Sequence, residues 1–133
     1  MTVLSTDTTA SVSTHVLDTS TGRPAEAVAV SLAARGGDAE PYTTLGASTT
    51  DADGRCTDLP ALPEGTTHVR LVFDTGSYFA SENQAEAQQD APRVRDSGAF
   101  FPEVAIAFAV TPGEHYHVPL LLNPFGYSVY RGS

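Results

Sequence analysis

The chain has 133 residues, of which 41% are hydrophobic and 17% are charged, a composition typical of one globular domain rather than a disordered chain. Its formal net charge of −9, with no basic stretch, argues against nucleic acid or an anionic membrane surface as a partner. The single cysteine excludes an intrachain disulfide, and the absence of lysine excludes Schiff-base chemistry.

The first ten residues differ in composition from the rest of the chain. Residues 1–10 are polar and rich in threonine, which predicts a flexible N-terminal arm ahead of a domain spanning residues 11–133. The arm has neither the basic nor the apolar region of a signal peptide, and no apolar run approaches the roughly 18 residues of a membrane span. We therefore expect a cytoplasmic protein.

Short segments rich in Val, Thr, Leu and Phe follow one another along the domain, separated by Gly, Pro and Asp, and they predict β-strands. The expected strands are 11–18, 27–34, 42–50, 67–74, 103–110, 115–122 and 127–131, with a short edge strand after the turn at 51–55. Residues 78–90 predict a helix with Ser81 as its N-cap. Many short strands with one short helix indicate an all-β sandwich.

Alternation along the strand at 115–122 separates an apolar face from a polar one. Its even positions are expected to face the core and its odd positions to face outward; the even set is Tyr116, Val118, Leu120 and Leu122, and the odd set is His115, His117, Pro119 and Leu121.

The first and last predicted strands show a similar alternation. Val12, Thr14 and Val16 form the expected core face of the first strand, which leaves His15 on the opposite face with Leu17. If these strands and the strand at 115–122 share a sheet, His15, His117 and Tyr130 stand together on its outer surface. Histidines beside exposed apolar groups indicate an oligomer interface, a ligand site, or both.

A metal site is an alternative use of the histidines. His115 and His117 project from one strand face like a ligand pair, with His15 as the candidate third ligand. We predict no metal and no cofactor, but this alternative stays open. The DADG turn at 51–54 lacks the spacing of an EF-hand calcium loop. Cys56 is expected to pack as a small buried residue. His68 is expected near the start of a strand, without a partner.

Five segments together carry a family resemblance: HVLDTSTGRPA (15–25), DGR (53–55), RLVFDTGSYF (70–79), FFPEV (100–104) and HYHVPLLLNPFGYSVYRGS (115–133). In this order they resemble the 5-hydroxyisourate hydrolase family, purine-catabolic enzymes related to transthyretin. The resemblance runs from about His15 to Ser133. Its most specific part is the Tyr-Arg-Gly-Ser terminus, which separates these hydrolases from true transthyretins.

The sequence departs from the family pattern in two places. Asn123 stands where the family usually has serine. The segment 80–99 is longer than usual, and the extra residues are expected in a surface loop.

The resemblance implies a transthyretin-like (prealbumin-like) sandwich of two four-stranded sheets with one short helix. It also implies a homotetramer with active sites at the dimer–dimer interface. The implied reaction is hydrolysis of a cyclic amide, which opens the six-membered ring of 5-hydroxyisourate to 2-oxo-4-hydroxy-4-carboxy-5-ureidoimidazoline in urate degradation.

The family's functional residues carry over onto this sequence position by position. The catalytic set is His15, Arg55 and His117, and the substrate-binding set is Tyr130, Arg131, Gly132 and Ser133. Which histidine is the general base stays open.

Two alternative functions remain for the protein. One is a non-catalytic transthyretin-like carrier of small aromatic ligands in the tetramer channel, and the other is an accessory sandwich that mediates assembly alone. The histidines and the terminus favour the hydrolase.

Overall fold

The computed structural model describes residues 9–37, 41–87 and 99–132, and the side chains of 82–87 are outside that description. Most of the expected N-terminal arm, the last part of the expected helix and Ser133 therefore lie outside the described residues. No helix among the described residues is long and apolar enough to cross a membrane.

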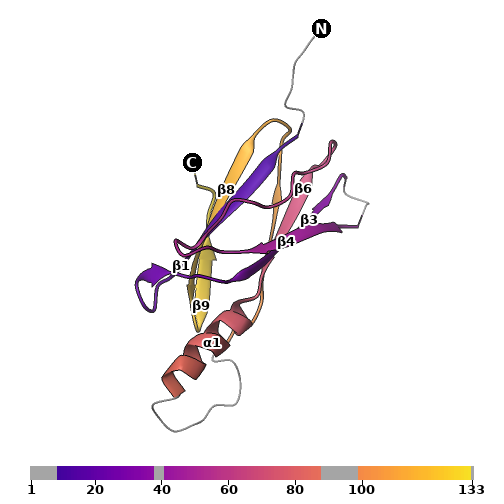
Figure 1. Cartoon of the computed structure of the whole chain (residues 1–133). Helices are drawn as coiled ribbons and strands as arrows, with labels where there is room; N and C mark the ends of the chain where they lie inside the picture. The colour runs from indigo at the N-terminus through magenta and orange to yellow at the C-terminus, as the bar shows by residue number, and fades with distance from the viewer. Residues whose placement is uncertain (1–8, 38–40, 88–98, 133) are drawn as a thin grey trace.

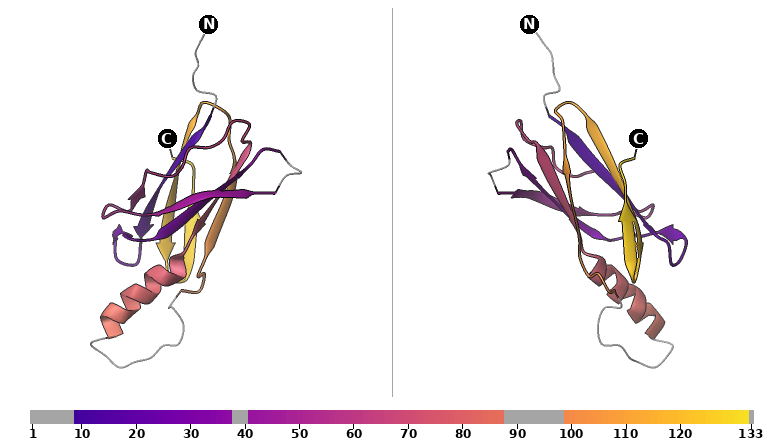
Figure 2. Two further views of the ribbon diagram at one scale, coloured as in Figure 1. Left: turned by 45° about the vertical axis from the view of Figure 1, so that its right-hand side comes forward. Right: turned by 180° about the vertical axis from the view of Figure 1, so that it is seen from behind.

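Two β-sheets face each other, with a helix at one end of the pair (Figures 1 and 2). The first sheet has the order β2 (Arg23–Pro24), β1 (Ser11–Asp18), β8 (His115–Asn123), β9 (Gly126–Val129), and β5 (Arg55–Cys56) also pairs with β1. The second sheet has the order β4 (Thr43–Thr49), β3 (Ala29–Arg35), β6 (His68–Phe73), β7 (Val104–Ala109). The expected all-β sandwich is confirmed, and the seven longer strands lie where the alternation and the turn residues predicted them.

The first sheet has five strands rather than the expected four. β8 pairs in parallel with β1 along the whole of one edge. The short strands β2 and β5, of two residues each, both pair with the other edge of β1. β2 pairs with Leu17 and Asp18, while β5 pairs with Thr14 and His15. The strand β2 was not predicted, because two residues are too few to show an alternating pattern.

Side chains from both sheets meet in one core. The predicted inward positions of β1 and β8 are buried, with Val16 and Leu120 both fully inaccessible to solvent. From the other sheet, Leu71 and Phe73 are equally buried. Each fully buried side chain of this size stabilises the fold by roughly 1.5–3 kcal/mol. Burial of one face of β1 and β8 fixes which side chains point outward.

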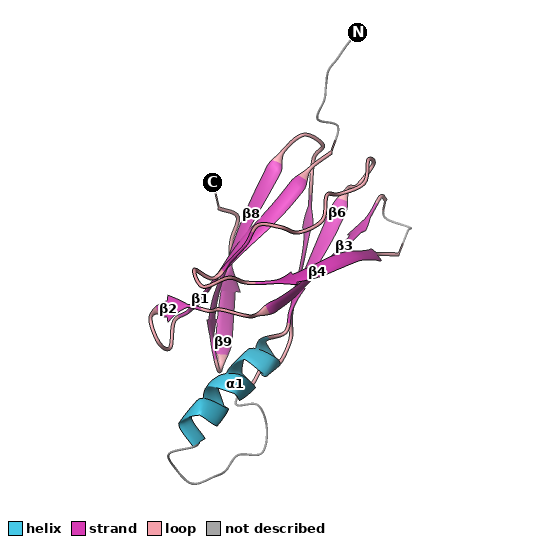
Figure 3. Cartoon of the chain, in the orientation of Figure 1, coloured by secondary structure: helices cyan, strands magenta, loops and turns pink. Residues whose placement is uncertain are grey.

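The helix α1, drawn in cyan in Figure 3, spans Thr75–Ala87 and so begins earlier than expected. Its N-cap is Asp74, whose Oδ1 accepts a hydrogen bond from the Ser77 amide at 3.0 Å. The prediction that Ser81 is the N-cap was therefore wrong, since Ser81 lies within the helix with an exposed side chain. The first turns are helical because Tyr78 and Phe79 pack into the core, which overrides their modest helix propensity.

Candidate active site

The two predicted histidines lie together on the outer face of the first sheet. β1 and β8 run parallel with Ser13 opposite His117, which brings the side chain of His117 close to that of His15. Their ring centroids are 6.5 Å apart at an interplanar angle of 34°. His15 Nε2 donates a hydrogen bond to the Asp53 carbonyl oxygen at 2.9 Å. Because a carbonyl can only accept, neutral His15 carries its proton on Nε2 and presents Nδ1 as its basic nitrogen.

Arg55 reaches the same face through a cross-strand pair. In the antiparallel pairing of β1 with β5, Arg55 stands directly opposite His15. The alternation of side chains along the strands did not identify Arg55 as a site residue. Only the family resemblance indicated it. A sequence signal does exist, however, in the tight Asp-x-Asp-Gly turn immediately before a short edge strand.

The turn before Arg55 is held by hydrogen bonds and by a glycine. Asp51 Oδ1 accepts from the amides of Asp53 and Arg55, each at 2.9 Å. The hydrogen bond from the Arg55 amide is the main cause that holds the pKa of Asp51 below its ordinary value. Gly54 has a φ of +78°, and a Cβ there would lie 2.3 Å from the Val16 carbonyl oxygen. Only glycine allows β5 to approach β1 this closely.

Burial and neighbouring charge make protonation of His117 unfavourable. Burial is the first cause that lowers the pKa of His117, followed by the charges of His15, Arg55 and His115. The ring is therefore neutral near pH 7, as a general base must be. Within the described residues, its Nδ1 bonds to Ser13 Oγ at 2.9 Å and its Nε2 has no protein partner. A neutral imidazole beside a guanidinium is suited to water activation and to stabilisation of an oxyanion.

The C-terminal segment runs back along β8 towards His117. The Tyr130 amide donates to the Pro119 carbonyl at 3.3 Å, and the Gly132 amide donates to the His117 carbonyl at 2.7 Å. A Cβ at position 132 would lie 3.0 Å from Cδ2 of His117. Glycine therefore permits the close approach of the chain end to the site.

The structure does not bring the side chain of Arg131 to the histidines. Its guanidinium lies over the Tyr116 ring at 4.4 Å and pairs with Glu114 Oε1 at 3.3 Å. Tyr116 belongs to the core-facing set of β8, so within this chain the Arg131 side chain lies on the opposite side from His117. Tyr130 is 57% exposed, and Ser133 lies outside the described residues.

Other residues singled out from the sequence have structural partners. Cys56 is buried as expected, and burial raises the pKa of its thiol. Asn123 Oδ1 accepts from the Phe125 amide at 2.9 Å, so asparagine supplies a hydrogen bond at this bend. The expectation that His68 has no partner was wrong, since its Nδ1 bonds to Thr67 Oγ1 at 2.8 Å.

The described part of the chain holds no group of three His, Cys, Asp or Glu side chains placed to bind a metal ion. His115 and His117 both bond to Ser13 Oγ instead, each at 2.9 Å. The metal alternative therefore gains no support from the positions of these side chains.

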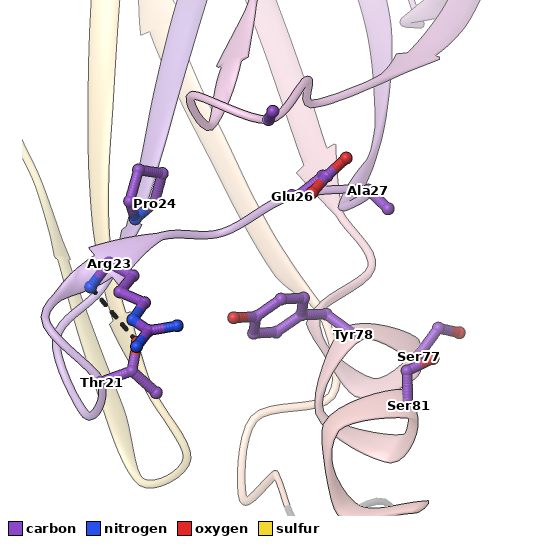
Figure 4. Close-up of a pocket in the computed structure, with 9 residues that line it drawn as sticks. Thr21, Arg23, Pro24, Glu26, Ala27, Ser77, Tyr78 and Ser81 are labelled. Atoms are coloured by element: carbon purple, nitrogen blue, oxygen red, sulfur yellow. Dashed lines mark hydrogen bonds between the residues drawn. The ribbon is translucent and has the colours of Figure 1, made fainter. Parts of the chain in front are cut away.

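A cavity of about 780 Å³ lies between α1 and the loop that joins β1 to β2 (Figure 4). It is lined by Thr21, Arg23, Pro24, Glu26, Ala27, Ala52, Ser77, Tyr78 and Ser81. None of the predicted site residues is among them, so this cavity is separate from the candidate active site.

Two facing sheets and a histidine–arginine group on one outer face define a transthyretin-like sandwich with a candidate hydrolytic site. Residues 12–132 match the HIUase/Transthyretin family, and the chain belongs to this family.

Individual relatives within the family are similar over most of the chain. The chain is 39% identical to the 5-hydroxyisourate hydrolase of Salmonella typhimurium over 124 residues, which are 92% of this chain and 80% of that protein. The solved structure of Klebsiella pneumoniae 5-hydroxyisourate hydrolase is 36% identical, with a TM-score of 0.69 over 92% of this chain and 98% of that one. Transthyretin from Sparus aurata is 25% identical, with a TM-score of 0.69 over 91% and 95% of the two chains.

Proposed function

We propose that this protein is a 5-hydroxyisourate hydrolase, which opens the six-membered ring of its substrate by hydrolysing a cyclic amide in urate degradation. The observation that carries the proposal is the meeting of His15, Arg55 and His117 on one face from three different strands. The names of the similar proteins from Salmonella typhimurium and Klebsiella pneumoniae support the substrate.

Each of the three side chains has a different role in amide hydrolysis. His117 takes a proton from water through Nε2, and the oxygen of that water attacks the carbonyl carbon of the ring amide. Arg55 stabilises the oxyanion that forms, because its charge is permanent. When the carbon–nitrogen bond breaks, the leaving nitrogen takes the proton held on His117 Nε2, and the new carboxylic acid releases its own proton to solvent to give the carboxylate. His15, with Nδ1 as its basic nitrogen, holds the water or shares the proton transfer.

The assembly forms the second part of the proposal. A homotetramer, as the family resemblance implies, would place the sites at the interface between dimers. The partial exposure of Leu17 and Leu121 beside the histidines supports contact with another subunit on this face. The terminal residues Tyr130 to Ser133 would then shape the pocket and bind the substrate.

The competing function is a non-catalytic carrier of small aromatic ligands, since the transthyretin of Sparus aurata shares the fold. A carrier needs a cavity but no base. The neutral, partly buried His117 beside Arg55 favours the hydrolase.

An ultraviolet absorbance assay tests the proposal. Urate oxidase generates 5-hydroxyisourate in situ. The decay of 5-hydroxyisourate is followed with the wild-type protein and with His117→Ala. We expect the wild-type protein to accelerate the decay and His117→Ala to lower turnover by about 10²- to 10³-fold, the range typical of a lost acid–base group. His68→Ala is the matched control, because His68 lies on β6 in the other sheet. Decay no faster than the spontaneous rate, from folded protein, would contradict the proposal.

A further inference from the structure

A continuous line of hydrogen bonds runs from His117 to the protein surface. His117 Nδ1 bonds to Ser13 Oγ at 2.9 Å, and Ser13 Oγ also bonds to His115 Nε2 at 2.9 Å. The other nitrogen of His115, Nδ1, bonds to Ser11 Oγ at 2.6 Å. Ser11 and His115 are exposed, whereas Ser13 is only 7% exposed. The line therefore joins the candidate base to solvent through one buried hydroxyl.

The donors and acceptors along this line of hydrogen bonds depend on one another, because each side chain has few protons to donate. Ser13 has one hydroxyl proton, and within the described residues its only side-chain partners are the two imidazole rings. If it accepted from both rings, its own proton would be left without an acceptor in a nearly buried place, which is costly. Ser13 therefore accepts from one ring and donates to the other.

Two arrangements satisfy every bond in this line when both rings are neutral. In the first, His117 and His115 both carry their proton on Nδ1, and Nε2 of His117 is free to accept a proton. In the second, both carry it on Nε2, and Nε2 of His117 is a donor. The tautomers of the two rings must change together, because the single hydroxyl proton of Ser13 serves both.

We propose that Ser13 and His115 are positioning residues that form, with Ser11, a proton relay through which His117 acts first as base and then as acid without retaining a positive charge. The proposal rests on the hydrolase function proposed above and extends it to residues that the family resemblance did not assign.

The protons balance in both directions. When His117 Nε2 takes a proton from water, its Nδ1 proton passes to Ser13 Oγ, the Ser13 proton to His115 Nε2, the His115 Nδ1 proton to Ser11, and the Ser11 proton to solvent. When Nε2 then gives its proton to the leaving nitrogen, a solvent proton enters at Ser11 and each transfer runs backwards. Every group ends as it began, and no oxidant or further reactant is needed.

The surroundings of His117 explain the advantage of such a relay. The titratable and charged groups near the ring are His15 on β1, Arg55 on β5 and His115 on β8, and together with burial they disfavour the imidazolium form. A base that had to keep its proton as a cation beside Arg55 would raise the barrier of the reaction. Passing the charge outward as it forms avoids this cost.

The first arm of the test uses nitrogen NMR and needs no substrate. Long-range ¹⁵N–¹H spectra of the neutral rings report which nitrogen of His115 and of His117 is protonated. We expect matching tautomers in the wild-type protein, and loss of the match in Ser13→Ala, where both rings lose their shared partner. Ser13→Thr keeps the hydroxyl and should keep the match. Independent tautomers in the wild-type protein, or the same spectra in Ser13→Ala, would overturn the relay.

The second arm uses turnover. Ser13→Ala and His115→Ala should each lower kcat by roughly ten-fold with little change in KM, a part of the ~10²- to 10⁴-fold that acid–base catalysis contributes. Ser13→Thr should recover most of the loss, and Ser31→Ala on β3 is the control. In mixtures of H₂O and D₂O, the dependence of kcat on deuterium content should be curved for the wild-type protein and linear for Ser13→Ala, because several protons move together only in the former.

The two arms separate the two proposals. A wild-type protein that does not accelerate 5-hydroxyisourate decay contradicts the hydrolase, while matched tautomers would still be seen by NMR. An active wild-type protein whose kcat is unchanged in both Ser13→Ala and His115→Ala contradicts the relay alone.

Discussion

The position of His117 beside a guanidinium has a consequence at the scale of a single residue. Burial comes first among the causes that lower its pKa, and the charges of His15, Arg55 and His115 add to it. A lowered pKa keeps the ring neutral, and able to accept a proton, down to a more acidic pH than an ordinary histidine, whose pKa is about 6.5.

Arg55→Gln tests the contribution of the guanidinium. Removing one positive charge removes one cause of the shift, so the pKa of His117 should rise towards the ordinary value. The base form would then be lost at a higher pH as the solution is acidified. An NMR titration of the His117 ring protons measures this directly, independent of turnover. Arg23→Gln on β2 removes a charge that is not among the causes acting on His117, and an equal rise in both variants would contradict the assignment.

At the scale of an element, the start of α1 depends on Asp74. Its carboxylate accepts from the Ser77 amide at 3.0 Å and from the Ser77 hydroxyl at 2.8 Å. Asp74→Ala should lower the free energy of unfolding by about 1 kcal/mol, the usual contribution of an N-cap. Urea denaturation measures the change, and Ser81→Ala serves as the control with an effect of a few tenths of a kcal/mol. A larger effect from Ser81→Ala would place the cap where the sequence first predicted it.

We expect the end of the chain after β9 to support the proposed site more than the fold. Gly132 bonds to the His117 carbonyl, while Arg131 stacks over Tyr116. Gly132 is half-buried and the Arg131 side chain is exposed, so both contacts contribute little to stability: a cation–π contact with an exposed guanidinium is worth about 0.5–1 kcal/mol.

Deleting residues 130–133 should therefore reduce activity by about 100-fold or more, as expected for loss of groups that hold a catalytic site in place, with only a small fall in Tm. The hydrolase assay and a thermal melt measure the two effects on one sample. Glu114→Gln removes the negative charge that pairs with Arg131 but keeps an oxygen that can accept from the Tyr116 hydroxyl, so it should leave both nearly unchanged. Full activity in the truncated chain would remove the terminus from the site.

At the scale of the whole molecule, large side chains remain exposed on the single chain. Phe100, Phe125 and Tyr130 are 71%, 77% and 57% exposed, and Phe101 makes edge-to-face ring contacts with Phe100 and Tyr127. The exposed rings of Phe100, Phe101 and Tyr127 are in contact with one another, and an exposed apolar group of this kind marks a surface for contact with another molecule.

We expect the homotetramer that the family resemblance implies to form in solution, with activity that depends on assembly. Sedimentation velocity over a dilution series measures the mass, and the hydrolase assay at the same concentrations measures turnover. Specific activity should fall as the tetramer dissociates, because the proposed site lies between dimers. A fully active monomer would contradict this arrangement.

Much of the fold could be predicted from the sequence because its causes are local. Alternating apolar and polar residues within β1 and β8 fixed which side chains face the core, and turn residues marked the strand ends. This alternation also placed His15 and His117 on one outer face once the two strands were assumed to be neighbours. The helix start was missed because its first turns are held by packing of Tyr78 and Phe79, not by propensity.

The sequence by itself therefore determined the class of fold, the core-facing side chains of β1 and β8 and the face that carries the histidines. Tertiary structure decided the partners across that face: Arg55 opposite His15, Arg131 over Tyr116, and Ser13 between His115 and His117. These contacts join residues 15 to 104 positions apart in the chain. They depend on the register between strands and on the path of the turns, which an alternating pattern within one strand does not specify.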